Sequence, residues 1–232
     1  MKKAVIFDLD GTLLNSLQDL GNSTNASLRA FGLPARSMEE VRQFVGNGVG
    51  ELIRRSVPAG TSAEIQAKCL AYFCEHYQTY MYSHTRPYDG VELMLEQLQQ
   101  AGIKTGILSN KFQNAAYELR EKYFKDKIED VQGEQDAVPR KPDPSGLYLL
   151  MKRMQVHPQE TVYVGDSPED AETAQNAGVD FIGVTWGYRS LAKLQEAGTK
   201  YWIDAPRQLI PFIRRLFCEK DRKKGLTNDD SL

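Results

Sequence analysis

Short apolar segments alternate with helical patterns along most of the chain. Apolar runs that fit buried strands lie at residues 4–8, 103–108, 161–164 and 180–184, with weaker candidates at 128–131 and 201–203. Helical patterns separate them, at 90–101, 113–122, 145–154, 169–177, 189–196 and 206–217. Strands that alternate with helices of this length predict a mostly parallel sheet covered on both faces. We therefore expect an α/β fold with a Rossmann-like parallel-sheet core.

Residues 17–82 break this alternation. They carry helical patterns at 17–31, 38–56 and 62–82 and no convincing strand, and the turn-forming stretch 86–90 marks their end. This pattern predicts an all-helical insert between the first strand and the rest of the sheet. The expected layout is an α/β core from residues 1–15 and 84–217, a helical cap from 16–83 and a polar tail from 218–232.

Composition excludes several classes of function. The chain has 232 residues with 29 basic and 31 acidic side chains, so charge gives no case for a nucleic-acid or anionic-membrane partner. No apolar run approaches the roughly 20 residues that span a bilayer, and the four-residue run after Met1-Lys2-Lys3 is too short for a signal peptide. Three cysteines without a pairing pattern fit reduced thiols. We expect a cytoplasmic protein, either a monomer or a homodimer.

Polar residues cluster at four predicted strand-to-loop junctions. Asp8 and Asp10 precede Gly11-Thr12, and the other clusters lie at 109–111, 140–144 and 165–170. The carboxyl ends of parallel strands share one sheet edge, so the four clusters can converge there. Each has a plain structural reading alone, as a helix cap or a solvated charge. Together they supply the acids, lysine and hydroxyl that phosphoryl transfer to a carboxylate requires.

The chemistry of a phosphate monoester explains this requirement. The ester is anionic and repels an anionic nucleophile, and a magnesium ion held by oxygen ligands offsets that repulsion. A lysine and a hydroxyl hold the phosphoryl oxygens as charge spreads over them. A carboxylate nucleophile splits hydrolysis into two steps, and a second carboxyl moves the proton.

The four clusters resemble the motifs of the haloacid dehalogenase superfamily of phosphatases. Asp8-Leu9-Asp10-Gly11-Thr12 is similar to its first motif, Ser109 to its second, Lys141 to its third, and Gly165-Asp166 with Asp170 to its fourth. The insert resembles the family's helical type of cap. Within the superfamily, residues 45–49, 87–91 and 109–111 resemble segments of phosphoglycolate phosphatases. Asn15 departs from the pattern, because many relatives have an acid there.

The resemblance implies a role for each motif residue. Asp8 would be the nucleophile and Asp10 the general acid and base. Asp170 would orient Lys141 or a metal-bound water, unless it only caps a helix. Magnesium would be held by Asp8, the backbone carbonyl of Asp10, and Asp166. The substrate contacts would come from Ser109, Asn110, Lys141, Gly11, Thr12, Asn47 and Arg54.

The glycine-rich stretch 46–50 allows two interpretations. It follows no strand and lacks the spacing of a dinucleotide-binding loop. It is either a tight turn between cap helices or a backbone contact to the substrate. The flanking Arg42, Arg54 and Arg55 could meet a substrate carboxylate.

We expect magnesium-dependent hydrolysis of a small phosphorylated metabolite through an aspartyl phosphate, with 2-phosphoglycolate as the best candidate. The alternatives are a sugar-phosphate phosphatase, a pyrophosphatase and a phosphomutase similar to β-phosphoglucomutase. A more distant alternative is a non-enzymatic phospho-acceptor signalling domain, which has no need of a helical insert.

Overall fold

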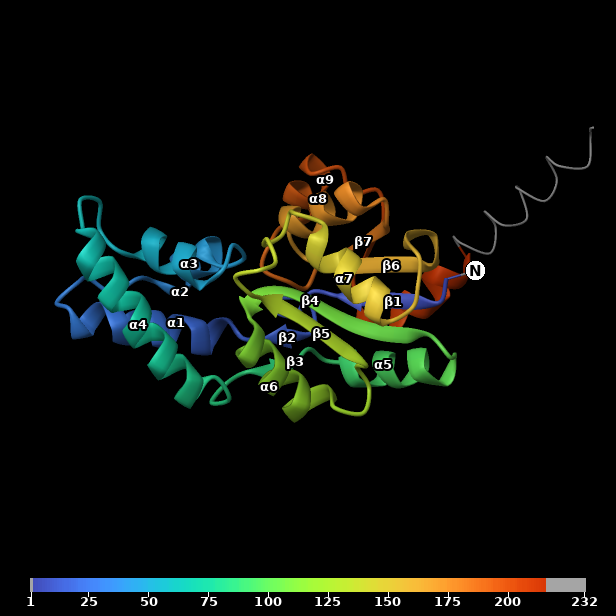
Figure 1. Ribbon diagram of the computed structural model, residues 1–232, viewed down its shortest axis with the longest axis horizontal. Helices are drawn as coiled ribbons and strands as arrows, with labels where there is room; N and C mark the ends of the chain where they lie inside the picture. The colour runs from blue at the N-terminus through green and yellow to red at the C-terminus, as the bar shows by residue number, and fades with distance from the viewer. Residues whose placement is uncertain (1, 216–232) are drawn as a thin grey trace, which may run out of the picture.

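The computed structural model describes residues 2–215 and contains a six-stranded parallel sheet (Figure 1). The spatial order of its strands is β5-β4-β1-β6-β7-β8, and every neighbouring pair is parallel. This confirms the expected α/β fold. The strands are β1 (Ala4–Phe7), β4 (Lys104–Phe112), β5 (Asp130–Glu134), β6 (Thr161–Gly165), β7 (Asp180–Val184) and β8 (Trp202–Ile203).

Helices cover both faces of the sheet, and β1 shows how the sequence arranges this. Val5 and Phe7 belong to the hydrophobic cluster under α5 (Val91–Gln100) and α6 (Gln113–Phe124). Ala4 and Ile6 belong to the second cluster, under α7 (Ser145–Arg153) and α8 (Pro168–Ala177). Successive side chains of a strand point to opposite faces, so a continuous apolar run suits a strand buried on both sides. The shorter helices are α9 (Leu191–Glu196), η1 (Pro158–Glu160) and η2 (Pro206–Gln208).

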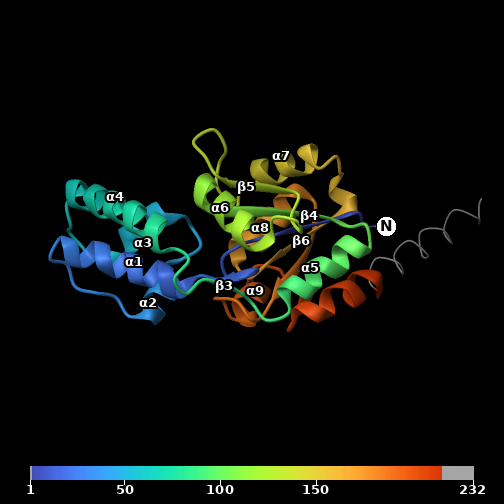
Figure 2. The ribbon, with the colours of Figure 1, turned by 90° about the horizontal axis from the view of Figure 1, so that it is seen from below.

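The insert forms four helices, which we call the helical unit. These are α1 (Leu17–Ala30), α2 (Met38–Phe44), α3 (Val49–Ser56) and α4 (Ala63–Tyr80), and they lie to one side of the sheet in both ribbon views (Figures 1 and 2). The helical pattern expected at 38–56 is two helices. Gly46 and Gly48, with φ of 122° and 82°, take conformations that a helix cannot continue, so a turn separates α2 from α3, and residues 49–50 belong to α3.

A two-residue pair of strands joins the helical unit to the sheet. β2 (Leu14–Asn15) and β3 (Arg86–Pro87) pair antiparallel. Asp19, in the first turn of α1, accepts hydrogen bonds from the backbone amides of His84 (2.9 Å) and Thr85 (2.8 Å). The outgoing and returning chain segments are therefore tied side by side.

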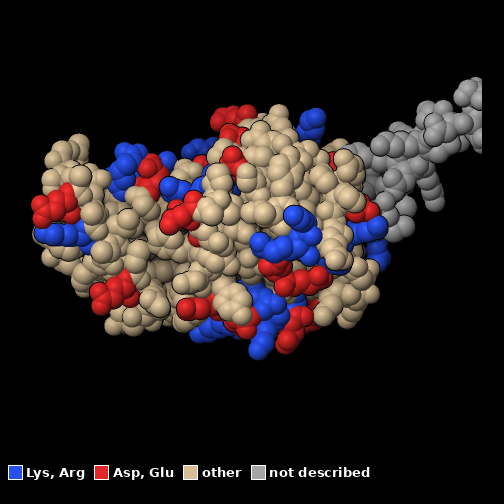
Figure 3. Space-filling view, viewed as in Figure 1, with Lys and Arg blue, Asp and Glu red and all other residues tan. Residues whose placement is uncertain are grey.

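Charged side chains of both signs mix over the face shown in Figure 3. Between residues 2 and 215, none of the helices has the length and apolarity needed to cross a membrane. The predicted polar tail, 218–232, and the last two residues of the helix expected at 206–217 lie outside the described residues.

Candidate active site

The predicted clusters line one small cavity at the carboxyl ends of β1, β4 and β6. The cavity has a volume of about 40 Å³, and the helical unit contributes to its wall. Ser109, Asn110 and Lys111 were expected to follow their strand but lie within β4, where a register shift between Leu108 and Phe112 interrupts the pairing with β5. The lining residues are Asp8, Asp10, Leu20, Val45, Gly46, Gly48, Val49, Leu52, Ser109, Asn110, Lys111, Lys141, Asp166, Ser167, Tyr188 and Arg189.

Lys141 joins two buried carboxylates. Its Nζ lies 2.7 Å from Oδ1 of Asp8 and 2.7 Å from Oδ1 of Asp170. The hydroxyl of Tyr163 in β6 lies 2.8 Å from the same Asp170 oxygen and 3.2 Å from Nζ. The other oxygen of Asp170 accepts from the amide and hydroxyl of Ser167, at the start of α8. Asp170 therefore both caps α8 and orients Lys141, two roles that the sequence left as alternatives.

Burial and charge shift the ionisation of this cluster. Burial raises the pKa of Asp8 well above its usual range. The charge of Lys141 lowers this pKa, whereas repulsion from Asp170 and Asp166 raises it further. Burial alone would lower the pKa of Lys141, but Asp170 and Asp8 raise it well above its usual range. Lys141 therefore stays protonated, and its charge favours an ionised Asp8.

Asp166 is held at the other side of the same cluster. One of its oxygens accepts from the hydroxyl of Thr12 (3.3 Å) and the other from the amide of Tyr188 (2.6 Å). Burial first, and then repulsion from Asp170, raises the pKa of Asp166 to about 7. Gly11 packs so closely that a Cβ there would come within 2.5 Å of Asp166 Oδ2.

The donor set fits a divalent cation. One carboxylate oxygen from each of Asp8, Asp166 and Asp170 lies within 4.8 Å of the other two, and all three residues are buried. The single ammonium of Lys141 does not balance three carboxylates, and oxygen ligands suit a hard cation such as Mg²⁺. Asp170 binds the ammonium of Lys141 and caps α8, whereas Asp166 accepts hydrogen bonds only from neutral donors. Among the described residues, Oδ2 of Asp8 accepts no hydrogen bond, so Asp8 and Asp166 are the carboxylates better placed to bind a metal.

Asp10 occupies a separate environment. Its Oδ1 accepts a hydrogen bond from the hydroxyl of Ser16, and its Oδ2 lies 2.9 Å from Nζ of Lys111. The hydroxyl of Tyr188 lies 3.1 Å from that of Ser16 and accepts from the Ser16 amide at 3.0 Å. These contacts hold the Asp10 side chain away from the three-carboxylate cluster.

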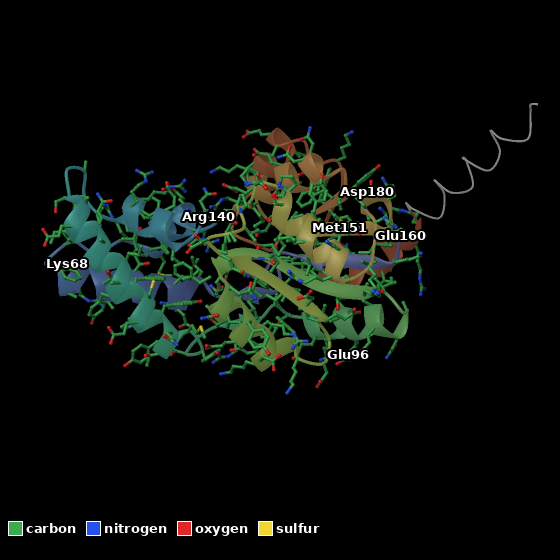
Figure 4. All side chains as sticks on the ribbon, viewed as in Figure 1. Lys68, Glu96, Arg140, Met151, Glu160 and Asp180 are labelled. Carbon is green, nitrogen blue, oxygen red and sulfur yellow. The ribbon has the colours of Figure 1, made fainter. Side chains whose placement is uncertain are left out.

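Three side chains from β4 and from loops of the α/β part of the chain hold the loop between α2 and α3. Asn110 donates to the carbonyl of Gly46 (3.0 Å) and Arg140 to that of Asn47 (2.9 Å). Arg189 donates to the carbonyls at 42 (2.6 Å), 43 (3.4 Å) and 45. Figure 4 shows Arg140 on the side of the sheet that faces the helical unit. The loop is thereby fixed over the cavity.

The remaining sequence candidates lie in different surroundings. Arg54 is exposed, and its guanidinium binds Glu51 at 2.6 and 2.7 Å. Arg55 also binds Glu51, and Arg42 lies near Glu39. Asn47 contributes its carbonyl to Arg140, and neither Asn47 nor any of these arginines lines the cavity. Gly11 and Thr12 contact Asp166 and do not line the cavity either.

The chain is similar to known proteins over most of its length. Residues 5–184 match the model of the haloacid dehalogenase-like hydrolases. The chain belongs to this family. Phosphoglycolate phosphatase 1 of Pseudomonas aeruginosa is 32% identical across 100% of this chain and 85% of its own length. A phosphoglycolate phosphatase of Vibrio parahaemolyticus is 34% identical across 91% of this chain and 96% of its own.

Solved structures of haloacid dehalogenase-like hydrolases share the fold. A predicted phosphoglycolate phosphatase from Haemophilus somnus 129PT has a TM-score of 0.83 and 26% identity, covering 91% of this chain and 97% of that one. A candidate phosphoglycolate phosphatase from Lactobacillus delbrueckii subsp. bulgaricus has a TM-score of 0.85 and 29% identity, covering 90% and 97%. The family match and these relatives together show that the chain is a phosphatase of the haloacid dehalogenase-like family.

Five residues of this phosphatase site had no role assigned from the sequence. Lys111 was part of a recognised cluster and so carried a signal. Tyr188 lies between the strand expected at 180–184 and the helix expected at 189–196. Ser16 begins the predicted insert, and Tyr163 lies inside an apolar strand where an aromatic residue suggests only core packing. Arg189 donates to backbone carbonyls, and the sequence of side chains does not indicate which carbonyls an arginine will meet.

Proposed function

We propose that this protein is a magnesium-dependent phosphatase that hydrolyses 2-phosphoglycolate through an aspartyl phosphate on Asp8. The observation that carries the proposal is that Asp8, Asp10, Ser109 and Lys141 line one cavity, with Asp8 and Asp10 in different environments. We further propose that residues 16–83 act as a cap on a core formed by 1–15 and 84–217.

The geometry gives each carboxylate its own task. Oδ1 of Asp8 is held by Lys141, and among the described residues Oδ2 accepts no hydrogen bond, so it is available to attack phosphorus. The Asp8 oxygen–phosphorus bond forms as the ester oxygen–phosphorus bond breaks. Asp10 donates its proton to the departing ester oxygen. Asp10 then takes a proton from the water that hydrolyses the aspartyl phosphate, which frees phosphate and restores Asp8.

The surrounding groups stabilise the charge of the phosphoryl group. The hydroxyl of Ser109 and the ammonium of Lys141 lie in the cavity wall, where they hold the phosphoryl oxygens. Asp8, the backbone carbonyl of Asp10, and Asp166 would hold Mg²⁺, which neutralises negative charge when bound. Asp170 and the hydroxyl of Tyr163 position Lys141 for this task.

Two observations support glycolate as the leaving group. The curated relatives that span most of this chain are named phosphoglycolate phosphatases. The cavity of about 40 Å³ has room for a few water-sized groups, which suits a small substrate.

The test is phosphate release from a substrate panel with Mg²⁺, using wild type and Asp8→Asn. The panel holds 2-phosphoglycolate, ethyl phosphate, pyrophosphate, glucose 6-phosphate and β-glucose 1-phosphate. We expect 2-phosphoglycolate to give the highest kcat/KM, and Asp8→Asn to be inactive on every substrate. Equal activity of the two proteins would overturn the mechanism, and preference for an ester without a carboxylate would overturn the glycolate assignment.

Two further readouts separate the alternatives. Glucose 6-phosphate formed from β-glucose 1-phosphate would identify a phosphomutase. Mass spectrometry of acid-quenched enzyme should show a phosphoryl group on Asp8 that disappears when substrate is exhausted. A label that persists without turnover would identify a phospho-acceptor signalling domain instead.

A further inference from the structure

Lys111 places a buried positive charge beside the proposed proton donor. Its Nζ lies 2.9 Å from Oδ2 of Asp10, and its side chain is only 2% exposed. In the proposed mechanism Asp10 faces the departing ester oxygen, so Lys111 stands next to the atoms attached to that oxygen. Lys111 also lines a second cavity of about 430 Å³, which lies between α4 and α6.

The other cations near the cavity are committed to different partners. Lys141 lies between Asp8 and Asp170, on the phosphoryl side. Arg189 donates to backbone carbonyls of the helical unit. Of the three cations in the described cavity wall, Lys111 is therefore the one placed to receive a charge on the leaving group.

We propose that Lys111 determines specificity by binding a leaving-group carboxylate one carbon away from the reacting oxygen. This inference rests on the proposed function. A single methylene separates the ester oxygen of 2-phosphoglycolate from its carboxylate. When that oxygen faces Asp10, the carboxylate lies within reach of an ammonium that already contacts Asp10. Hydrogen bonds between a buried ammonium and a carboxylate are among the strong ones.

The helical unit helps to hold Lys111 in place. Nζ lies 4.7 Å from the ring centroid of Tyr77, which is 5% exposed and belongs to α4. A cation over an aromatic face is attracted by the ring electrons. Because Lys111 belongs to β4 and Tyr77 to the helical unit, the ring adds to the hold of Asp10 on the ammonium only when the two parts are together.

The second cavity limits the length of an acidic leaving group. Beyond Lys111 its wall carries the carboxylates of Glu118, Glu134 and Asp136. A longer acid would bring its carboxylate close to these groups, and like charges placed together are costly. A carboxylate held at Lys111 stays on the near side of them, so the site favours a short acid.

The test compares 2-phosphoglycolate with ethyl phosphate, in which a methyl group replaces the carboxylate. In Lys111→Met, kcat/KM for 2-phosphoglycolate should fall about 30-fold or more beyond any fall for ethyl phosphate, mainly through KM. Lys111→Arg should restore part of this preference. Lys122→Met is the matched control, because Lys122 also lies over a tyrosine ring, that of Tyr82 at 4.0 Å, but outside the cavity.

The outcomes separate this inference from the function on which it rests. Equal kcat/KM of the wild type for 2-phosphoglycolate and ethyl phosphate would overturn both the proposed substrate and the role of Lys111. A wild-type enzyme that prefers 2-phosphoglycolate, with the same preference kept in Lys111→Met, would overturn only the role of Lys111. In that case Lys111 would act on Asp10 alone.

A binding measurement gives a readout independent of turnover. Calorimetry compares 3-phosphonopropanoate, in which a methylene replaces the ester oxygen of 2-phosphoglycolate, with propylphosphonate, which lacks the carboxylate. Wild type should bind the former about 30-fold more tightly, and Lys111→Met should bind the two nearly equally. Tight propylphosphonate binding by Lys111→Met would also show that the variant is folded. A preference unchanged by Lys111→Met would contradict the proposal.

Discussion

Nζ of Lys141 and Oδ1 of Asp8 lie 2.7 Å apart, although 133 positions separate the two residues in the chain. Lys141 is 4% exposed and Asp8 8% in their side chains, so the pair has little contact with water. The parallel sheet creates this contact, because it brings the end of β1 to the loop before α7. The same ion pair should therefore affect both the stability of the fold and the proposed release of phosphate.

Replacing Lys141 tests that connection. Lys141→Met leaves the Asp8 and Asp170 carboxylates without their ammonium, so the free energy of unfolding should fall by about 3–5 kcal/mol. Phosphate release should fall by at least about a hundredfold, because a charge-stabilising donor is lost. Urea unfolding and a turnover assay measure the two effects. Lys152→Met, on the exposed face of α7, is the control, and wild-type stability in Lys141→Met would contradict the prediction.

Replacing Asp10 and replacing Asp166 should change the affinity for Mg²⁺ to different extents. Asp10 points its carboxylate at Ser16 and Lys111, whereas Asp166 belongs to the three-carboxylate cluster. Asp10→Asn should therefore keep Mg²⁺ affinity within a fewfold of wild type and lose turnover. Asp166→Asn should weaken Mg²⁺ binding by at least about tenfold. Calorimetric titration with Mg²⁺ measures this, and equal losses of affinity in the two variants would refute the division of roles.

The raised pKa of Asp166 predicts a pH dependence of stability in the metal-free protein. Between about pH 4, where an unfolded aspartate titrates, and about pH 7, folded Asp166 holds a proton that the unfolded chain has lost. The folded state binds more protons in this window, so its stability falls as pH rises. Urea unfolding with a chelator at pH 5 and pH 8 should show the fall. This fall in the free energy of unfolding should be smaller in Asp166→Asn than in wild type. In the exposed control Asp126→Asn it should be the same as in wild type.

Arg189 should control how firmly the helical unit closes. Arg189→Ala removes its hydrogen bonds to the carbonyls at 42, 43 and 45. Amide exchange across 42–50 should become faster and KM should rise, while global stability changes by about 1 kcal/mol or less because the contacts are largely exposed. Arg153→Ala is the matched control, since Arg153 binds Asp130 and the carbonyl of Val131 away from the helical unit. Unchanged exchange across 42–50 would contradict this role for Arg189.

The sheet and its polar edge could be predicted because both depend on local patterns. Apolar runs mark strands buried on both faces, and the residues after such strands must share one edge. That reasoning placed Asp8, Asp10, Lys141 and Asp166 near one another. It could not assign a role to Tyr163, whose hydroxyl is the one polar atom of a fully buried aromatic side chain.

Contacts with the helical unit could not be predicted in the same way. Arg54 was expected to meet substrate, but the structure pairs it with Glu51, three positions earlier. That spacing is visible in the sequence and is typical of an ion pair along one helix. Asn110, Arg140 and Arg189 bind backbone carbonyls instead. Every residue has a carbonyl, so only the fold decides which ones these side chains meet.

The paired strands β2 and β3 have a consequence for the history of this chain. The helical unit leaves and rejoins the sheet at Asn15 and Arg86, which face each other in one antiparallel pair. The two ends of the insert are thus about 5 Å apart. An insert with adjoining ends can be lengthened, shortened or exchanged while the order of the sheet strands stays the same. The part of the cavity wall that the helical unit forms can therefore change by separate genetic steps, while Asp8, Lys111 and Lys141 keep their places.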